Sequence, residues 1–168
     1  MTQTMSTTTA HYAMYIGGQW VDTGEHYEIR SPATEELVAT VAKGTVADVD
    51  AAVAAAAAAF REGTWRRTPP AKRAAVINAV AERLIARLDE LAALQSRENG
   101  ATIRITGALH VGLSAAQLQY LAAIAADYEW ETAGPAIEPV AAEGIIVREP
   151  LGVVAAIVPW NIPLLTTV

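Results

Sequence analysis

The sequence predicts an α/β chain in which small β elements come first, about four helices follow, and a projecting β-hairpin leads to a buried parallel strand. Three observations support this prediction. Early segments alternate with period two, residues 45–132 repeat their apolar positions with the helical period, and residues 153–158 form an unbroken apolar run. A run without alternation is typical of a parallel strand that is covered on both faces.

The composition is that of a folded chain. Of the 168 residues, 52% are hydrophobic and 18% are charged, which favours a packed core over disorder. The net charge of -6 has the wrong sign for neutralising phosphates, so we expect no nucleic-acid partner. No run reaches the roughly 18 consecutive apolar residues that span a bilayer, so we also expect no membrane association.

The sequence contains no cysteine. This excludes disulfides, thiolate zinc sites and thiol nucleophiles within these 168 residues. A reaction that needs a thiolate therefore needs a residue from outside them.

The first segments predict a leader followed by short strands. Residues 1–10 are rich in serine and threonine and carry no basic residue, so they do not resemble a signal or transit peptide, and we expect a cytoplasmic location. Residues 1–14 are expected to be a disordered leader. The pair Gly17-Gly18 between short apolar runs predicts a tight hairpin, and residues 27–30 and 37–42 predict two more strands.

The first helix is predicted from Thr45 to about Gly63. Asp48 stands at the third helical position, where its carboxylate completes a capping box with Thr45. The many alanines between these ends predict close packing.

Three more helices follow. Thr68-Pro69-Pro70 is a helix start, since proline fits the first turn. The third helix covers residues 89–99 and ends at Gly100. The fourth is expected to run to about Thr132, ahead of Gly134-Pro135.

The last part of the chain returns to strand-like patterns. Residues 136–140 and 145–149 flank Glu143-Gly144 and predict the projecting hairpin. Pro159 ends the apolar run of residues 153–158, and Pro163 suits the start of one more helix.

The junction Pro159-Trp160-Asn161 is the candidate site. Open α/β sheets bind nucleotides and substrates where a buried parallel strand ends and a helix begins. There an aromatic ring can pack on a cofactor, and a side-chain amide can donate a hydrogen bond to a developing oxyanion. The same residues also fit a tryptophan that closes the core and an asparagine that caps the next helix.

Several motifs, in the same order, resemble the NAD(P)-dependent aldehyde dehydrogenase superfamily. They are Ile16-Gly17-Gly18-Gln19-Trp20-Val21, Ser31-Pro32-Ala33-Thr34-Glu35-Glu36, the helix of residues 45–60, Trp65-Arg66, Glu98-Asn99-Gly100, Arg148-Glu149-Pro150-Leu151-Gly152 and Pro159-Trp160-Asn161-Ile162-Pro163. The resemblance implies the N-terminal part of a Rossmann-type domain. Residues 15–133 then belong to the NAD(P)-binding domain, residues 134–150 to an oligomerisation hairpin, and residues 151–168 to the first nucleotide-binding strand and the start of the next helix.

The resemblance also implies roles for individual residues. Asn161 resembles the oxyanion-hole amide that stabilises the tetrahedral thiohemiacetal formed from an aldehyde. The cofactor, NAD or NADP, would lie along Ile157, Val158, Pro159 and Trp160, and Ile162 would face the aldehyde tunnel. The hairpin of residues 136–149 is similar to the arm through which family members form homo-oligomers.

The sequence departs from the family pattern at two places. Glu35 stands where members commonly carry a glycine, so a turn position with positive φ has lost its usual residue. In addition, the family's cysteine nucleophile, glutamate base, cofactor-binding lysine and Gly-rich loop are expected C-terminal to Val168.

Two hypotheses for function therefore stay open. In the first, the chain is the N-terminal fragment of an enzyme that oxidises an aldehyde to a carboxylic acid with NAD(P)⁺, and these residues alone are inactive because they lack the nucleophile. In the second, it is a short non-catalytic module that assembles through its hairpin.

Other candidate sites are weaker. Residues 107–114 have the glycine spacing of a phosphate loop but carry Leu113 where the lysine belongs. The three histidines show no second ligand at metal spacing, so we expect no metal site and interpret them as surface or hydrogen-bonded residues. The basic residues that flank the second helix start are expected to be solvated; they are Arg66, Arg67, Lys72 and Arg73.

Overall fold

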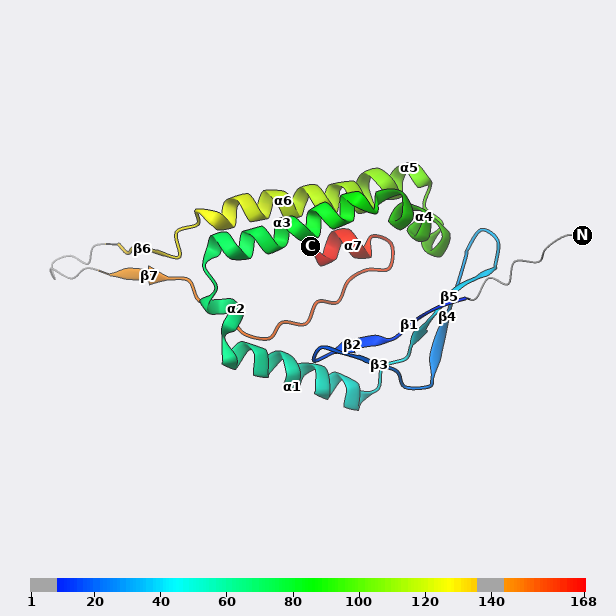
Figure 1. Cartoon of the computed structure of the whole chain (residues 1–168), viewed down its shortest axis with the longest axis horizontal. Helices are drawn as coiled ribbons and strands as arrows, with labels where there is room; N and C mark the ends of the chain where they lie inside the picture. The colour runs from blue at the N-terminus through cyan, green and yellow to red at the C-terminus, as the bar shows by residue number, and fades with distance from the viewer. Residues whose placement is uncertain (1–8, 136–143) are drawn as a thin grey trace, which may run out of the picture.

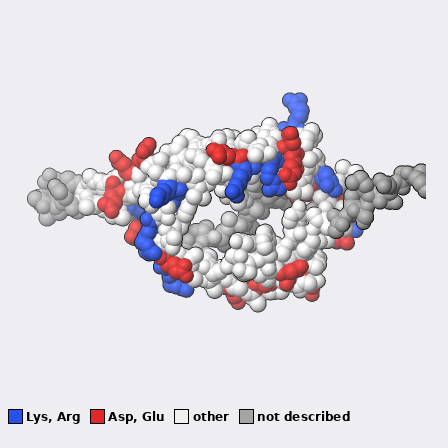
Figure 2. All heavy atoms as spheres, viewed as in Figure 1, with Lys and Arg blue, Asp and Glu red and all other residues white. Residues whose placement is uncertain are grey.

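The computed structural model describes residues 9–135 and 144–168. Figure 1 shows two parts that face each other. A layer of helices lies on one side, helix α1 (Val46–Glu62) and a strand hairpin lie on the other, and the chain that follows strand β7 (Ile145–Val147) runs between them. The space-filling view shows that the molecule is hollowed between the two parts (Figure 2).

Five short strands open the described chain. They are β1 (Ala10–Tyr12), β2 (Met14–Ile16), β3 (Gln19–Val21), β4 (His26–Arg30) and β5 (Leu37–Ala42). Strand β5 lies in the middle of a three-stranded sheet, parallel to β1 and antiparallel to β4, and β2 pairs with β3 as a separate hairpin. The expectation of a disordered leader through residue 14 is wrong for β1, because its main chain pairs with residues 39–41.

The predicted tight hairpin is the turn between β2 and β3. Gly17 and Gly18 have φ angles of 58° and 86°, which glycine adopts at little cost and which the favoured two-residue hairpin turn requires. The turn brings Tyr15 opposite Trp20, and their ring centroids lie 5.0 Å apart.

Helix α1 begins and ends where the sequence predicted. The side chain of Thr45 accepts a hydrogen bond from the main chain of Asp48, and the carboxylate of Asp48 accepts one from the main chain of Thr45. Gly63 ends the helix in the left-handed conformation, with φ at 67°. The prediction of close packing is wrong for this helix, since none of its residues is buried.

The helical layer consists of α3 (Pro70–Ala86), α4 (Leu88–Asn99), and a continuous helix made of α5 (Ile103–Ile105), η1 (Thr106–Gly112) and α6 (Leu113–Ala126). Short helix α2 (Thr64–Arg67) links α1 to this layer. Helices α3 and α6 lie side by side in Figure 1 and contact each other along their lengths. Both helices bury small residues, namely Ala74 and Ala81 on α3 and Ala115 and Ala122 on α6. Close packing of alanines therefore occurs here.

Segment η1 is a π-helix, in which the turns are wider than in an α-helix. A Cβ atom on Gly112 would lie 3.0 Å from the carbonyl oxygen of Gly107, so the glycine permits this geometry. The wide turn places His110 against α4, where its Nδ1 lies 2.8 Å from Oε1 of Gln95, and both residues are buried.

The fourth predicted helix ends earlier than expected. Helix α6 stops at Ala126, and the residues predicted to be helical around Thr132 form strand β6 (Glu131–Ala133), which pairs antiparallel with β7. The main-chain N–H of Arg148 also donates to the carbonyl of Trp130, 2.9 Å away. Pairing with a distant segment therefore overrides the local helical pattern.

The helix from Ile103 to Ala126 is, by length and composition alone, long and apolar enough to cross a membrane, and it is the single such helix in residues 9–135 and 144–168. In this structure α6 packs along α3 while η1 packs on α4, so the helix takes part in the contacts of the helical layer.

Candidate functional site

Residues 153–158 do not form the predicted buried parallel strand. No strand lies between β7 and α7 (Pro163–Thr167) in the described chain, and Val154 and Ile157 are 73% and 98% exposed. A parallel strand needs a neighbouring strand for its main-chain groups and a layer on each face for its side chains. Among the described residues no strand lies alongside this run, so the apolar pattern is present but the sheet around it is not.

The predicted cofactor residues follow one another along this exposed segment. Ile157 and Trp160 are 98% and 79% exposed, while Val158 is 38% exposed and Pro159 is also exposed. No main-chain hydrogen bond joins these four residues to another part of the described chain. Their side chains and main-chain groups are therefore accessible.

Asn161 is held at its main chain while its side chain stays exposed. Its carbonyl oxygen accepts a hydrogen bond of 3.1 Å from Nδ2 of Asn99, at the end of α4. The Oδ1 atom of Asn99 in turn accepts one of 2.9 Å from the main-chain N–H of Ala101. Between these residues Gly100 ends α4 with φ at 79°, and this turn brings the main-chain N–H of Ala101 back to the side chain of Asn99.

Ile162 begins the last helix. Its carbonyl oxygen accepts hydrogen bonds from the main-chain N–H of Thr166 at 3.2 Å and from the hydroxyl of that residue at 3.0 Å. Helix α7 then contacts η1 and α6, and Pro163 takes its first turn as predicted. Ile162 itself is half-buried where the exposed segment meets the helical layer.

The alternative interpretation of this junction does not hold here. A tryptophan that closes the core would be buried, but Trp160 is 79% exposed. A capping asparagine would stand at the N-cap of α7, but that position is Ile162, and no side chain makes a capping hydrogen bond there.

The second strand of the predicted hairpin is observed in part, and its first strand lies outside the described residues. Strand β7 covers residues 145–147 of the expected 145–149 and pairs with β6, while residues 136–140 lie outside the described residues. The main-chain N–H of Gly134 donates to the carbonyl of Gly144 at 2.7 Å. A Cβ atom on Gly134 would lie 3.0 Å from this carbonyl, so the close approach of the two chains depends on glycine.

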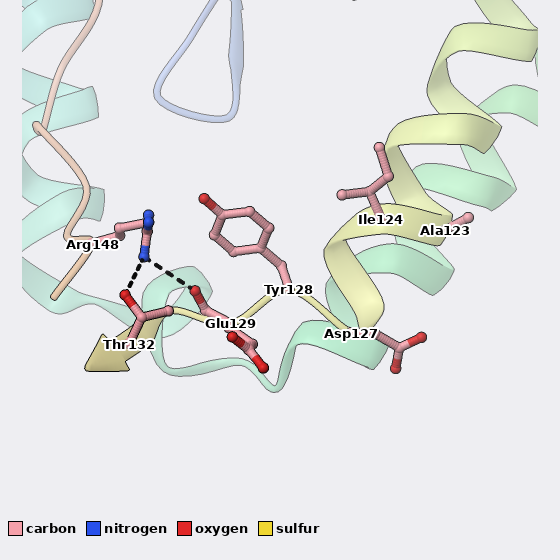
Figure 3. Close-up of a pocket in the computed structure, with 7 residues that line it drawn as sticks. All are labelled: Ala123, Ile124, Asp127, Tyr128, Glu129, Thr132 and Arg148. Carbon is pink, nitrogen blue, oxygen red and sulfur yellow. Dashed lines mark hydrogen bonds between the residues drawn. The ribbon is translucent and has the colours of Figure 1, made fainter. Parts of the chain in front are cut away.

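A pocket of about 400 Å³ opens beside this hairpin, at the end of α6. In Figure 3 the guanidinium of Arg148 turns towards Thr132 and the main chain of Glu129, with its Nη1 3.3 Å from the hydroxyl of Thr132. The guanidinium also lies 5.7 Å from the ring centroid of Tyr128. None of the residues that line the pocket belongs to the segment from Ile157 to Ile162. The pocket is thus a feature of the hairpin base and separate from the predicted site.

Glu98 directly precedes Asn99, the residue whose side chain holds the main chain of Asn161. Partial burial raises the pKa of Glu98 above its ordinary value of 4.5, because burial penalises the charged form.

His11 and His26 are surface residues that make hydrogen bonds, as expected, but the prediction that they lack a second potential ligand is wrong. His11 and His26 both contact the carboxylate of Asp22, at 2.8 Å and 2.9 Å. Asp22 and His26 stand four positions apart in the sequence, a spacing that indicates a possible pair, whereas His11 joins them only because β5 lies between β1 and β4. His110, by contrast, is a buried, hydrogen-bonded histidine, as expected.

The remaining weak candidates behave largely as expected. Residues 107–114 lie within the helix formed by η1 and α6, not in a phosphate loop. Among the basic residues, Arg73 is partly buried rather than fully solvated, and its Nη1 donates to the carbonyls of Thr68 at 2.8 Å and of Arg66 at 3.2 Å.

Comparisons with known proteins cover almost the whole chain. Residues 20–168 match the aldehyde dehydrogenase family. The chain is 39% identical to phenylacetaldehyde dehydrogenase of Pseudomonas fluorescens over 162 residues, which are 94% of this chain and 32% of that protein. It is 36% identical to the NADP/NAD-dependent aldehyde dehydrogenase PuuC of Escherichia coli strain K12, with 92% and 31% covered.

Solved structures agree with the sequence relatives. The aldehyde dehydrogenase of Mycobacterium tuberculosis complexed with NAD⁺ superposes with a TM-score of 0.86 at 40% identity, over 95% of this chain and 33% of that one. The NAD-dependent aldehyde dehydrogenase of Sinorhizobium meliloti gives a TM-score of 0.87 at 34% identity, with 95% and 32% covered. The chain therefore belongs to the aldehyde dehydrogenase family, and it spans about a third of the length of these relatives.

Proposed function

We propose that this chain supplies the oxyanion-hole amide and part of the cofactor surface of an aldehyde dehydrogenase, which oxidises an aldehyde to a carboxylic acid with NAD(P)⁺. The observation that carries the proposal is the exposed side chain of Asn161, whose main chain is anchored by Asn99. An amide that is fixed at its backbone and unobstructed at its side chain is suited to donate a hydrogen bond to a negative oxygen.

The exposed segment before Asn161 fits a dinucleotide. Ile157 and Trp160 offer apolar surface, and their main-chain groups make no hydrogen bonds to other parts of the described chain. Such a segment can hold an adenosine and ribose by packing and by main-chain hydrogen bonds. NAD(P)⁺ would accept the hydride, and these residues would bind and orient it.

Asn161 would act on the substrate side of the reaction. When a thiolate adds to an aldehyde, the carbonyl oxygen becomes an oxyanion, and the Nδ2–H group of Asn161 would stabilise that charge more than it stabilises the neutral aldehyde. Ile162, directly after it, would border the path of the aldehyde. The thiolate itself cannot come from these 168 residues, which contain no cysteine.

The first experiment tests whether the 168-residue chain has aldehyde dehydrogenase activity on its own. The purified 168-residue chain, incubated with an aldehyde and NAD⁺ or NADP⁺, should form no NAD(P)H, because it has no thiol. Turnover by homogeneous material would overturn the proposal. Reading the gene beyond the codon for Val168 tests the complementary expectation of an open frame that encodes a cysteine nucleophile.

The second experiment tests Asn161 directly. In the protein that combines this chain with the cysteine, Asn161→Ala should lower kcat by about 10²–10³-fold, as expected for the loss of one oxyanion donor. The matched control is Asn78→Ala, which removes an exposed amide from α3 and should leave kcat unchanged. Equal activity of the two variants would contradict the role of Asn161.

For assembly, we propose that residues 136–149 pair with a second copy of the chain. Strand β7 supports this proposal, because Ile145, Ile146 and Val147 are 70%, 45% and 54% exposed, and exposed apolar strands favour association. Ile145→Lys should shift the protein to a smaller species in sedimentation, whereas Val46→Lys, at a position on α1 that is even more exposed, should not. An unchanged sedimentation profile for Ile145→Lys would count against this interface.

A further inference from the structure

Three side chains from separate segments meet on the exposed face of the N-terminal strands. His11 comes from β1, Asp22 follows β3, and His26 begins β4. Oδ2 of Asp22 lies 2.8 Å from Nε2 of His11, and Oδ1 lies 2.9 Å from Nε2 of His26. The edge of one imidazole ring points at the face of the other, with 4.5 Å between their centroids.

The strand register explains why the two histidines share a face. His11 lies opposite Thr40 and His26 lies opposite Ala42, and positions 40 and 42 of β5 point to the same side of the sheet. Ala42 carries only a methyl group, so the two rings can lean towards each other across β5. Asp22 reaches the pair from the separate β2–β3 hairpin.

Neighbouring groups hold two of the three side chains in place. Nδ1 of His11 lies 2.9 Å from the hydroxyl of Thr40; with its proton on Nδ1, the ring could bind a metal ion through Nε2 in place of the present contact with Asp22. Oδ1 of Asp22 accepts a hydrogen bond of 3.2 Å from the main-chain N–H of Gly24. Hydrogen bonds of this kind orient ligand side chains and fix the histidine tautomer in metal sites.

We propose that His11, Asp22 and His26 form a binding site for a divalent transition-metal ion of the Zn²⁺ class. The potential ligand atoms of the three residues lie within 4.8 Å of one another. Tetrahedral zinc with bonds of about 2.0–2.2 Å places its ligands roughly 3.4 Å apart, so small side-chain rotations suffice. Two imidazoles and one carboxylate suit zinc, nickel, cobalt or copper, whereas calcium and magnesium prefer oxygen donors alone.

The ion would replace the protons that now lie between the imidazoles and the carboxylate, so its binding releases protons. It would also connect the three-stranded sheet to the β2–β3 hairpin, since Asp22 belongs to one and the histidines to the other. The site is thus structural in character and independent of the aldehyde chemistry proposed for Asn161.

The test uses the tag-free protein and ZnCl₂ in a buffer that does not chelate metals. Titration calorimetry should give one Zn²⁺ per chain, and magnesium should not compete. The chain contains three histidines, so NMR of the imidazole signals has an internal control. Zn²⁺ should shift the signals of His11 and His26 and leave that of buried His110 in place.

Variants separate ligation from a general effect on folding. Asp22→Asn and His26→Gln each remove one ligand and should weaken Zn²⁺ binding by at least about 100-fold, since loss of an outer hydrogen bond alone costs about 10- to 100-fold. Thr40→Val keeps all three ligands and should weaken it by about tenfold. The matched control is Glu25→Gln, which removes a carboxylate three residues from Asp22 that pairs with Lys43, and it should bind like the parent.

Folding of each variant is checked by circular dichroism. If a ligand variant fails to fold, Thr40→Val and the histidine signals of the parent decide the question. The proposal is overturned if the parent binds no Zn²⁺, if the signals of His11 and His26 do not move, or if folded Asp22→Asn binds as tightly as Glu25→Gln.

Discussion

The side-chain amide of Asn99 donates a hydrogen bond of 3.1 Å to the main-chain carbonyl of Asn161, across 62 positions of sequence. It joins the end of α4 to the segment on which the proposed site depends. Since the side chain of Asn161 makes no part of this bond, Asn99 acts on the position of the site and not on its chemistry.

Replacing Asn99 should therefore impair the site without removing it. Asn99→Asp keeps the oxygen that accepts from Ala101 but loses the donor to Asn161. A net hydrogen bond contributes about 0.5–1.5 kcal/mol, so kcat of the assembled enzyme should fall by roughly 2- to 10-fold, with KM for the cofactor little changed. This loss is smaller than that expected for Asn161→Ala. Faster amide exchange at residues 160–163 is the second readout, and unchanged exchange would contradict the anchoring role.

Gly100 should be intolerant of a side chain for two independent reasons. Its φ angle is 79°, and an added Cβ would lie 2.8 Å from Cγ of Pro32. Gly100→Ala is therefore expected to lower the free energy of unfolding by about 1–3 kcal/mol in urea denaturation. The control is Gly107→Ala, whose Cβ would meet its neighbours at 3.8 Å or more. An equal loss in both variants would show that the left-handed turn is not the cause.

Glu35 should be a site where glycine stabilises the fold. It is the one non-glycine residue with positive φ in the described chain, at 61°, as its departure from the family pattern predicted. A left-handed conformation costs an ordinary residue about 1–2 kcal/mol, of which the greater backbone freedom of glycine in the unfolded chain cancels about half. Glu35→Gly should raise the free energy of unfolding by roughly 0.5–1 kcal/mol. Glu36→Gly, at a residue without positive φ, should lower it; stabilisation by both changes would refute the explanation.

Features that depend on neighbouring residues were predictable from the sequence. The capping box of Thr45, the turn at Gly17 and Gly18, and the helix end at Gly100 each follow from the few residues that form them. The strained turn at Glu35 was indicated by the family pattern, in which a glycine commonly stands at this position. In all these cases the main-chain conformation is set within a span of a few residues.

Features that depend on distant partners were not predictable in the same way. The run of residues 153–158 has the composition of a buried strand, yet among the described residues it has no partner strand and stays exposed. His11 joins Asp22 and His26 because β5 lies between β1 and β4. The anchor from Asn99 to Asn161 likewise required the structure, since nothing in the pattern of either segment indicates the other.

Two carboxyl groups on α4 should give the stability of the protein opposite dependences on pH. Burial raises the pKa of Glu98 above 4.5. The native state then binds the proton more tightly than the unfolded state, so this favourable contribution is present below pH 4.5 and is lost as pH rises through the native pKa. Glu98→Gln should therefore be more stable than the parent near neutral pH and no more stable in acid.

Glu90 is the matched comparison on the same helix. A hydrogen bond from Arg87, whose Nη2 lies 2.6 Å from Oε1 of Glu90, is the main reason that the pKa of this exposed carboxyl falls below 4.5. Its contribution is present above pH 4.5 and is lost as pH falls through the lowered native pKa. Glu90→Gln should therefore be less stable than the parent near neutral pH, with the difference vanishing in acid. Urea denaturation of both variants over this pH range checks the pair, and the same sign of change for both would show that the environment of one carboxyl has been misassigned.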